Sequence, residues 1–146
     1  MTKLYMAYGS NLNKGQMSVR CPTAKPVGSA MILGYELVFR GVADIQKSAD
    51  PNMMIPVGIW EIEASDEAAL DSYEGYPRLY GKIMVNGIMT YQMNTKRVMP
   101  PYVSYFNTIL QGYQDFGLDT TYLYDAAGWA TYEDMNRDDV FELESA

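Results

Sequence analysis

A hairpin signal in the second half of the chain constrains the fold more than any other feature of the sequence. The dipeptide Asn86-Gly87 separates two apolar runs, Tyr80–Val85 and Ile88–Met93. Asn and Gly tolerate positive φ, and the two-residue turn that they form has the twist that joins antiparallel strands. The two runs are therefore predicted to be paired antiparallel strands.

Other strands are predicted where β-branched, aromatic and aliphatic residues gather, at residues 4–8, 30–40 with an interruption at Gly34, and 57–63. Between them, residues 41–56 are polar and rich in turn formers. This segment is predicted to be a loop, either a cover over a substrate pocket or a plain surface connection.

Helices are predicted from apolar spacing and end signals at residues 14–19, 65–74, 102–116 and 119–127, with Ser65 and Asp119 as N-caps. Gly75 is predicted to end the second of these helices. Because the chain has hairpins and no repeated strand-helix-strand units, its order of elements indicates an α+β fold.

Length and charge restrict the kind of protein. A chain of 146 residues suits one domain, 1–146, and its acidic end, residues 133–146, is predicted to fray, with an apolar docking patch at Val140, Phe141 and Leu143. The net charge of −7 disfavours nucleic acid or an anionic membrane as a partner. Because no apolar run has the length of a membrane span or a signal peptide, a cytoplasmic protein is expected. The sequence does not predict an oligomeric state.

The missing residue types restrict the chemistry further. The chain has no histidine, which excludes Ser-His-Asp and Cys-His catalysis and disfavours a zinc or iron site, so neither a metal nor a cofactor is expected. Cys21 is the one cysteine, and without a histidine to activate it we interpret it as a structural residue. Acid-base chemistry is left to carboxylates, tyrosines or lysines.

The first strand runs directly into Gly9-Ser10-Asn11. Gly9 has no side chain to keep a ligand from the backbone, Ser10 adds a hydroxyl, and Asn11 adds an amide that could cap a following helix. The loop therefore suits an anion or an oxyanion, although the same residues are also common in a turn without any function.

Two carboxylates stand near the end of the second predicted helix. Glu74 falls in the last turn, where the helix dipole opposes a negative charge, and burial would raise its pKa further, as a general base for an ammonium proton requires. Asp71 lies three residues earlier and can share its face. Either carboxylate is a candidate for the catalytic group at this point, and the alternative for Glu74 is a solvent-exposed glutamate at a helix end. Arg20 is either a clamp for a substrate carboxylate or a brace of the loop.

These residues together form a pattern that resembles the gamma-glutamylcyclotransferase-like family over roughly residues 3–124. The sequence Tyr8-Gly9-Ser10-Asn11-Leu12 is followed by Leu70-Asp71-x-x-Glu74-Gly75 at the family's distance. The family's order is also kept by Arg20-x-Pro22-x-Ala24, Tyr35-x-Leu37-x-Phe39, Val57-x-Ile59-Trp60, Tyr80, Tyr91, and Pro100-x-Tyr102 before Gly112.

The resemblance implies a small, mostly antiparallel, barrel-like mixed sheet with helices packed outside. It also implies release of 5-oxoproline from a gamma-glutamyl amide or amine by attack of the substrate's own α-amine. In the family pattern Glu74 matches the general acid and base, and Asp71 matches a residue that braces the helix or the loop. The substrate-binding positions that it implies are Tyr8, Gly9, Ser10, Asn11, Leu12, Tyr80 and Tyr91. For Tyr80 and Tyr91, a core tyrosine whose hydroxyl is bonded to the backbone is the alternative.

Two other functions are compatible with the same sequence. One is a non-catalytic module that binds a small ligand or a partner on this fold, because a fold does not dictate an activity. The other is a structural protein with a vestigial pocket, whose 11 methionines and acidic end serve a partner surface. The sequence does not select among gamma-glutamyl amino acids, gamma-glutamylamines and related amides as substrates.

Overall fold

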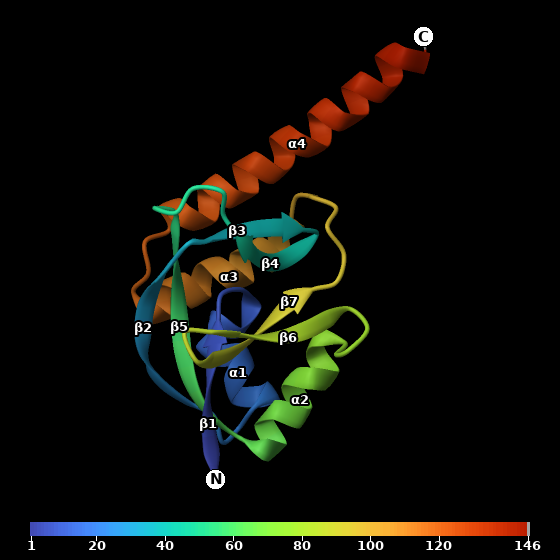
Figure 1. Ribbon diagram of the computed structural model, residues 1–146. Coiled ribbons are helices and arrows are strands. Elements are labelled where there is room, and N and C mark those ends of the chain that lie inside the picture. The colour runs from blue at the N-terminus through green and yellow to red at the C-terminus, as the bar shows by residue number, and fades with distance from the viewer. Residues whose placement is uncertain (146) are drawn as a thin grey trace.

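The computed structural model describes the backbone of residues 1–145 and the side chains of residues 1–137. A five-stranded mixed sheet forms the centre of the molecule (Figure 1). Its strands follow the order β2 (Lys25–Leu33), β5 (Met54–Glu63), β1 (Thr2–Ala7), β7 (Ile88–Met93), β6 (Tyr80–Val85). The central strand β1 pairs antiparallel with β5 and parallel with β7, so the loop that follows β1 leaves the middle of the sheet.

The predicted hairpin is confirmed, since β6 and β7 pair antiparallel in a register that brings Val85 opposite Ile88. The two turn residues have the positive φ values that the sequence predicts, 51° at Asn86 and 80° at Gly87. The conformational preferences of Asn86 and Gly87 therefore suffice to predict this pair of strands.

The predicted loop at residues 41–56 is wrong for most of its length. Residues 35–47 form a second hairpin, β3 (Tyr35–Arg40) and β4 (Val42–Lys47), and β5 begins at Met54. The hairpin turns at Gly41, where φ is 82°. Its polar residues are satisfied inside the protein, because Asp44 is fully buried, forms an ion pair with Arg40 at 2.7 Å and accepts the backbone N–H of Met93 at 2.8 Å.

The sheet is α+β and mostly antiparallel, as expected, but it is not closed. Within the described residues the strands form a five-stranded sheet with edges at β2 and β6 and a separate two-stranded sheet of β3 and β4. The backbone N–H of Met93 in β7 donates a hydrogen bond to the side chain of Asp44 in β4, and this bond links the two sheets where no backbone ladder joins them. The barrel-like shape that the resemblance implies is therefore open.

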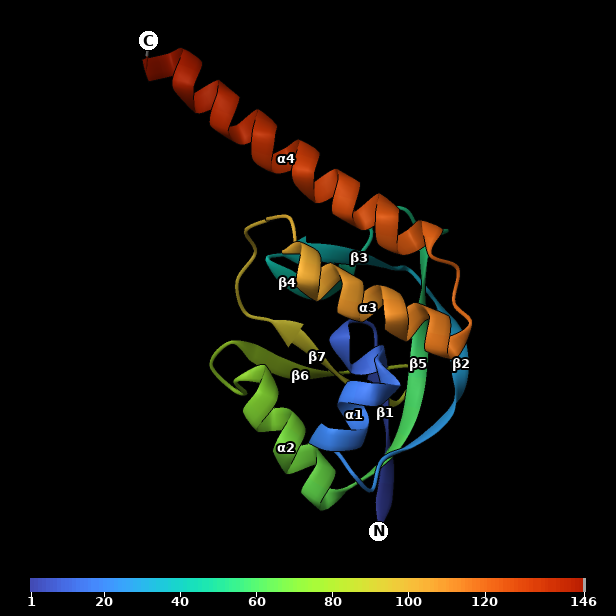
Figure 2. The same cartoon turned by 180° about the vertical axis from the view of Figure 1, so that it is seen from behind.

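Four α-helices and one 3₁₀ turn complete the fold: η1 (Ser10–Leu12), α1 (Lys14–Arg20), α2 (Ala64–Glu74), α3 (Val103–Phe116) and α4 (Thr121–Ser145). Helices α1 and α3 cover the rear face of the main sheet, α2 lies beside β6, and the second half of α4 extends beyond the rest of the molecule (Figures 1 and 2). The helices thus lie outside the sheet, as predicted.

Two details of the helices differ from the sequence predictions. Helix α2 is capped by Glu63 and not by Ser65, since Glu63 and Asp66 exchange side-chain and backbone hydrogen bonds in a capping box. The predicted helix at 119–127 continues to Ser145, although Asp119 does accept the backbone N–H of Thr121 at its start. Fraying of residues 133–146 stays a prediction, and the docking patch at Val140, Phe141 and Leu143 lies outside the described side chains.

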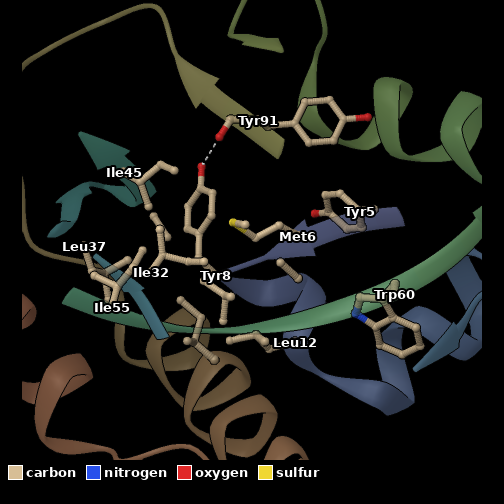
Figure 3. Close-up of a cluster of buried hydrophobic side chains, with 14 of the residues drawn as sticks. Tyr5, Met6, Tyr8, Leu12, Ile32, Leu37, Ile45, Ile55, Trp60 and Tyr91 are labelled. Carbon is tan, nitrogen blue, oxygen red and sulfur yellow. Dashed lines mark hydrogen bonds between the residues drawn. The ribbon is translucent and has the colours of Figure 1, made fainter. Parts of the chain in front are cut away.

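The core lies between the sheet and the helices and includes Met6, Leu12, Trp60 and Tyr91 (Figure 3). Leu12 is fully buried where η1 meets α3. A Cβ atom on Gly112 of α3 would lie 2.5 Å from Leu12 Cβ and 2.7 Å from the backbone nitrogen of Asn13. Only glycine allows this approach, and the contact fixes the position of the loop after β1.

Candidate active site

A cavity of about 250 Å³ opens beside the loop that follows β1. Six tyrosines are among the 13 residues that line it, namely Tyr5, Tyr8, Tyr73, Tyr80, Tyr91 and Tyr105. Among the described residues that line the cavity, Glu74 alone has a carboxylate, and none has a basic side chain. A largely aromatic pocket with one carboxylate suits acid-base chemistry on a small substrate.

Glu74 is the last residue of α2 and is directed toward the loop after β1. Gly75 follows it in the left-handed conformation, with φ 66°, and ends the helix as the sequence predicts. The Oε1 atom of Glu74 accepts a hydrogen bond from Asn11 Nδ2 at 3.2 Å. Burial raises the pKa of Glu74 from 4.5 to about 7, against the opposing effects of the Arg20 charge and the Asn11 hydrogen bond. A carboxyl group with this pKa can both accept and return a proton near neutral pH.

The predicted loop residues Gly9, Ser10 and Asn11 all line the cavity. They form a 3₁₀ turn in which the backbone N–H of Leu12 donates to Gly9 O and that of Asn13 donates to Ser10 O, both at 3.0 Å. Within the described part of the chain, the backbone N–H groups of Ser10 and Asn11 have no acceptor. These groups remain available to a bound anion or oxyanion.

Gly9 also makes room for the β3–β4 hairpin. A Cβ atom at this position would lie 2.9 Å from the Cβ of Ala43, which is closer than Cβ atoms approach in proteins. The backbone of Ala43 is in turn held by two tyrosines, since its N–H donates to Tyr105 Oη at 3.0 Å and its C=O accepts from Tyr80 Oη at 2.6 Å. The missed hairpin is therefore a wall of the cavity.

Asn11 has a different role from the helix cap that the sequence suggests. Asn13 caps α1, because its Oδ1 accepts the backbone N–H of Gln16 at 2.9 Å. The side chain of Asn11 lies in the cavity wall, where Nδ2 donates to Tyr5 Oη at 2.9 Å as well as to Glu74. Asn11 thus connects the loop directly to the carboxylate.

The three predicted tyrosines are among the residues that line the cavity, but their hydroxyls bond to the protein. Tyr8 Oη donates to the carbonyl of Tyr91 at 2.6 Å (Figure 3), and Tyr80 Oη donates to Ala43. Tyr91 Oη donates to Asp71 at 2.6 Å, and Lys82 forms an ion pair with the same carboxylate at 2.9 Å. Asp71 is therefore the brace that the sequence suggests, and its contacts hold Tyr91 in place.

One predicted site residue is not in the cavity and three lining tyrosines were missed. Leu12, the last residue of η1, is buried in the core, and its position after Ser10 and Asn11 in the sequence did not indicate this. Tyr73 bonds to Ser10 through the two hydroxyl groups at 2.9 Å. Tyr5 lies three residues before Tyr8, a spacing that places two side chains of a strand on opposite faces, so the sequence gave no signal for it. Nothing in the spacing of Tyr105 relates it to the loop either.

The structure also bears on metal binding and on membrane insertion. Along the described residues, no group of three or more His, Cys, Asp or Glu side chains is arranged to bind a metal ion. None of the helices that the structure describes is long and apolar enough to cross a membrane. Location in the cytoplasm stays a prediction.

The fold and the site together define a small α+β domain with a tyrosine-walled pocket and one carboxylate of raised pKa. Residues 5–108 match the family model "Gamma-glutamyl cyclotransferase, AIG2-like", and the chain belongs to this family. The resemblance found in the sequence is thereby confirmed at the level of the family.

Solved structures share the fold at low sequence identity. A structure titled "Gamma-glutamyl cyclotransferase" is 24% identical, with a TM-score of 0.73 and 86% of each chain covered. An uncharacterized protein from Homo sapiens is also 24% identical, with a TM-score of 0.71 and 86% of each chain covered. YkqA from Bacillus subtilis is 20% identical, with a TM-score of 0.69, and the match covers 89% of this chain and 54% of that one. No curated protein sequence matches the chain.

Proposed function

We propose that the protein is a gamma-glutamyl cyclotransferase that releases 5-oxoproline from a gamma-glutamyl amide or amine. The observation that carries the proposal is the position of Glu74, whose carboxyl group has a pKa of about 7 and lies within hydrogen-bond distance of the loop after β1. Membership of the family supports the reaction class.

The reaction needs little more than a proton carrier and a rigid pocket. The nucleophile is the α-amine of the substrate, and Glu74 accepts a proton from the α-ammonium group. The free amine then attacks the γ-carbonyl carbon, so that a C–N bond closes the five-membered ring. The bond to the departing nitrogen breaks as Glu74 returns its proton to that atom. The ring nitrogen gives up its second proton to the released amine, so that the products are 5-oxoproline and the amine in its ammonium form. Orientation of the folded substrate supplies much of the rate, because intramolecular attack reaches effective molarities of about 10⁵ M or more.

Two groups of the substrate compete for the loop after β1. The backbone N–H groups of Ser10 and Asn11 suit the oxyanion that develops on the γ-carbonyl, and they equally suit the α-carboxylate. Tyr8, Gly9, Tyr80 and Tyr91 complete the proposed substrate-binding set, and Leu12 is omitted because it lies in the core.

The test is release of 5-oxoproline from a panel of gamma-glutamyl amino acids and gamma-glutamylamines. Glu74→Gln is expected to lower turnover by at least about 10³-fold, since an amide cannot accept the ammonium proton. Glu67→Gln is the matched control in the same helix, because Glu67 faces Lys3 and Lys82 away from the cavity. Turnover that survives in Glu74→Gln would contradict the assignment of the base.

Binding measurements on the same panel separate catalysis from ligand capture. If the wild-type protein binds a member of the panel by calorimetry but releases no 5-oxoproline, the non-catalytic binding module becomes the better description. If release is observed, the preferred leaving amine names the substrate class.

A further inference from the structure

Arg20 is the last residue of α1 and lies beside the cavity without lining it. Its Nη1 donates to Asn11 Oδ1 at 2.6 Å, and its Nη2 donates to Gln16 Oε1 at 3.2 Å. The guanidinium carbon lies 3.5 Å from the centroid of the Tyr73 ring. Of the two roles that the sequence allows for Arg20, these contacts favour the brace over the substrate clamp, because its guanidinium group already bonds to the protein.

The contact with Asn11 fixes which way the asparagine amide points. A guanidinium group only donates hydrogen bonds, so the atom of Asn11 that faces Arg20 has to be the acceptor Oδ1. The Nδ2 group is then directed at Glu74, which as a carboxylate accepts. With the amide rotated by 180°, Oδ1 would face the carboxylate, and two acceptors would be in contact.

The contact with Tyr73 fixes a second group near the carboxylate. The guanidinium stacks on the Tyr73 ring, which makes a cation–π contact at van der Waals distance. The Tyr73 hydroxyl in turn bonds to Ser10 Oγ at 2.9 Å. One side chain from α1 therefore contacts two residues that line the cavity, Asn11, which bonds to Glu74, and Tyr73, which precedes it in the chain.

We propose that Arg20 is a positioning residue for the reaction, which orients the Asn11 amide and the Tyr73 ring around Glu74 without contacting the substrate. This inference rests on the proposed function. The sequence presents Arg20 as a clamp or a brace, and the structure assigns it the second role with named targets.

The charge of Arg20 adds a separate signature. Burial raises the pKa of Glu74, and the Arg20 charge opposes that rise. The other titratable groups that face Glu74 are tyrosines, Tyr5 and Tyr8 from β1 and its loop, Tyr80 from β6 and Tyr105 from α3. Burial raises the pKa of each of these tyrosines, so they stay neutral and Arg20 is the cation of the group.

Arg20→Met removes both the hydrogen bonds and the charge, and Arg97→Met is the matched control at an exposed position outside the cavity. We expect kcat to fall about 10- to 100-fold in Arg20→Met with KM changed by less than about threefold, as is typical when a partner of a reacting group is removed. The pH midpoint of kcat/KM is expected to move upward. Arg97→Met is expected to match the wild-type protein.

Arg20→Lys separates orientation from charge. Lysine retains the positive charge but has no planar fork to bond Asn11 and stack on Tyr73 at once. We expect its pH midpoint to stay near the wild-type value while kcat remains reduced. The double variant Arg20→Met/Asn11→Ala is expected to lose less than the product of the two single effects, because the part of the Arg20 effect that acts through Asn11 is already lost in Asn11→Ala.

Several results would overturn the inference. A rise in KM at unchanged kcat in Arg20→Met would make Arg20 a substrate clamp, and full activity in Arg20→Lys would show that charge alone is needed. If no protein, wild type included, turns over any substrate, the proposed function fails but the positioning role is still testable. The side-chain amide signals of Asn11 in NMR spectra should then titrate with Glu74 in the wild-type and Arg97→Met proteins. In Arg20→Lys we expect these Asn11 signals to have different shifts and a different response to pH. Signals that match those of the wild-type protein would contradict the positioning role.

Discussion

Glu74→Gln should make the protein more stable at high pH while it abolishes turnover. In acid, Glu74 is neutral in both the folded and the unfolded state, and its burial then has no electrostatic cost. Between the unfolded pKa of 4.5 and the folded pKa of about 7, the unfolded chain loses the proton while the folded protein keeps it. The folded state is therefore progressively destabilised as the pH rises through this interval, and the cost is constant above it.

The size of the effect follows from the two pKa values. Each pKa unit corresponds to about 1.4 kcal/mol, so the difference between 4.5 and about 7 amounts to about 3 kcal/mol at pH 8.5. At pH 5.5 the corresponding cost is about 1.4 kcal/mol. Solvent reaches part of the Glu74 side chain and reduces both numbers, so we expect Glu74→Gln to stabilise by about 2 kcal/mol at pH 8.5 and about 1 kcal/mol at pH 5.5.

Urea denaturation at the two pH values measures these differences directly. The glutamine carbonyl can still accept the hydrogen bond from Asn11 Nδ2, so the substitution isolates the charge. Glu67→Gln provides a control of opposite sign, since hydrogen bonds from Lys82 and Lys3 lower the pKa of Glu67 and its charge stabilises the fold. A gain for Glu74→Gln that is absent, or equal at pH 5.5 and pH 8.5, would refute the argument that burial raises this pKa.

Three further predictions concern the scaffold of the site. Gly112→Ala should lower the free energy of unfolding by about 1–3 kcal/mol and also reduce turnover, because its Cβ would meet the backbone of the loop after β1; calorimetry and the 5-oxoproline assay measure the two effects. Arg40→Met should destabilise by about 3–5 kcal/mol in urea denaturation, since Asp44 would be left buried without its cation, and a loss under 1 kcal/mol would show that water reaches this carboxylate. Tyr91→Phe should cost about 1–2 kcal/mol of stability through the lost hydrogen bond to Asp71, and unchanged stability would mean that this bond has no net value.

The sequence predicted those features that depend on local chemistry. The Asn86-Gly87 turn, the left-handed Gly75 after Glu74 and the strand before Gly9 all follow from conformational preferences of single residues or short runs. Glu74 could be selected because the helix end placed it and the resemblance to a family distinguished it from Asp71. Burial, which supplies its raised pKa, could only be measured in the folded structure.

The features that were missed depend on contacts between distant segments. Residues 41–56 are polar, and their polarity suggested a loop, but Asp44 is neutralised by Arg40 and bonded to Met93 within the fold. The sequence around Asp44 does not show that these partners will be available to it in the folded protein. Tyr105 reaches the cavity from α3 for the same kind of reason, through the close packing that Gly112 permits in that helix.

The walls of the cavity come from segments that are far apart in the chain. Ser10 and Tyr73 are separated by 63 residues, and Tyr8 and Tyr91 by 83. No fragment of the chain can therefore assemble the pocket before the whole domain has folded. A ligand that binds only the folded form acts as a noncovalent cross-link across these segments, and at 100 times its Kd it would add about 2.7 kcal/mol to the free energy of global unfolding. Amide hydrogen exchange in the most protected strands should then slow by a factor of about 100, even at positions remote from the cavity.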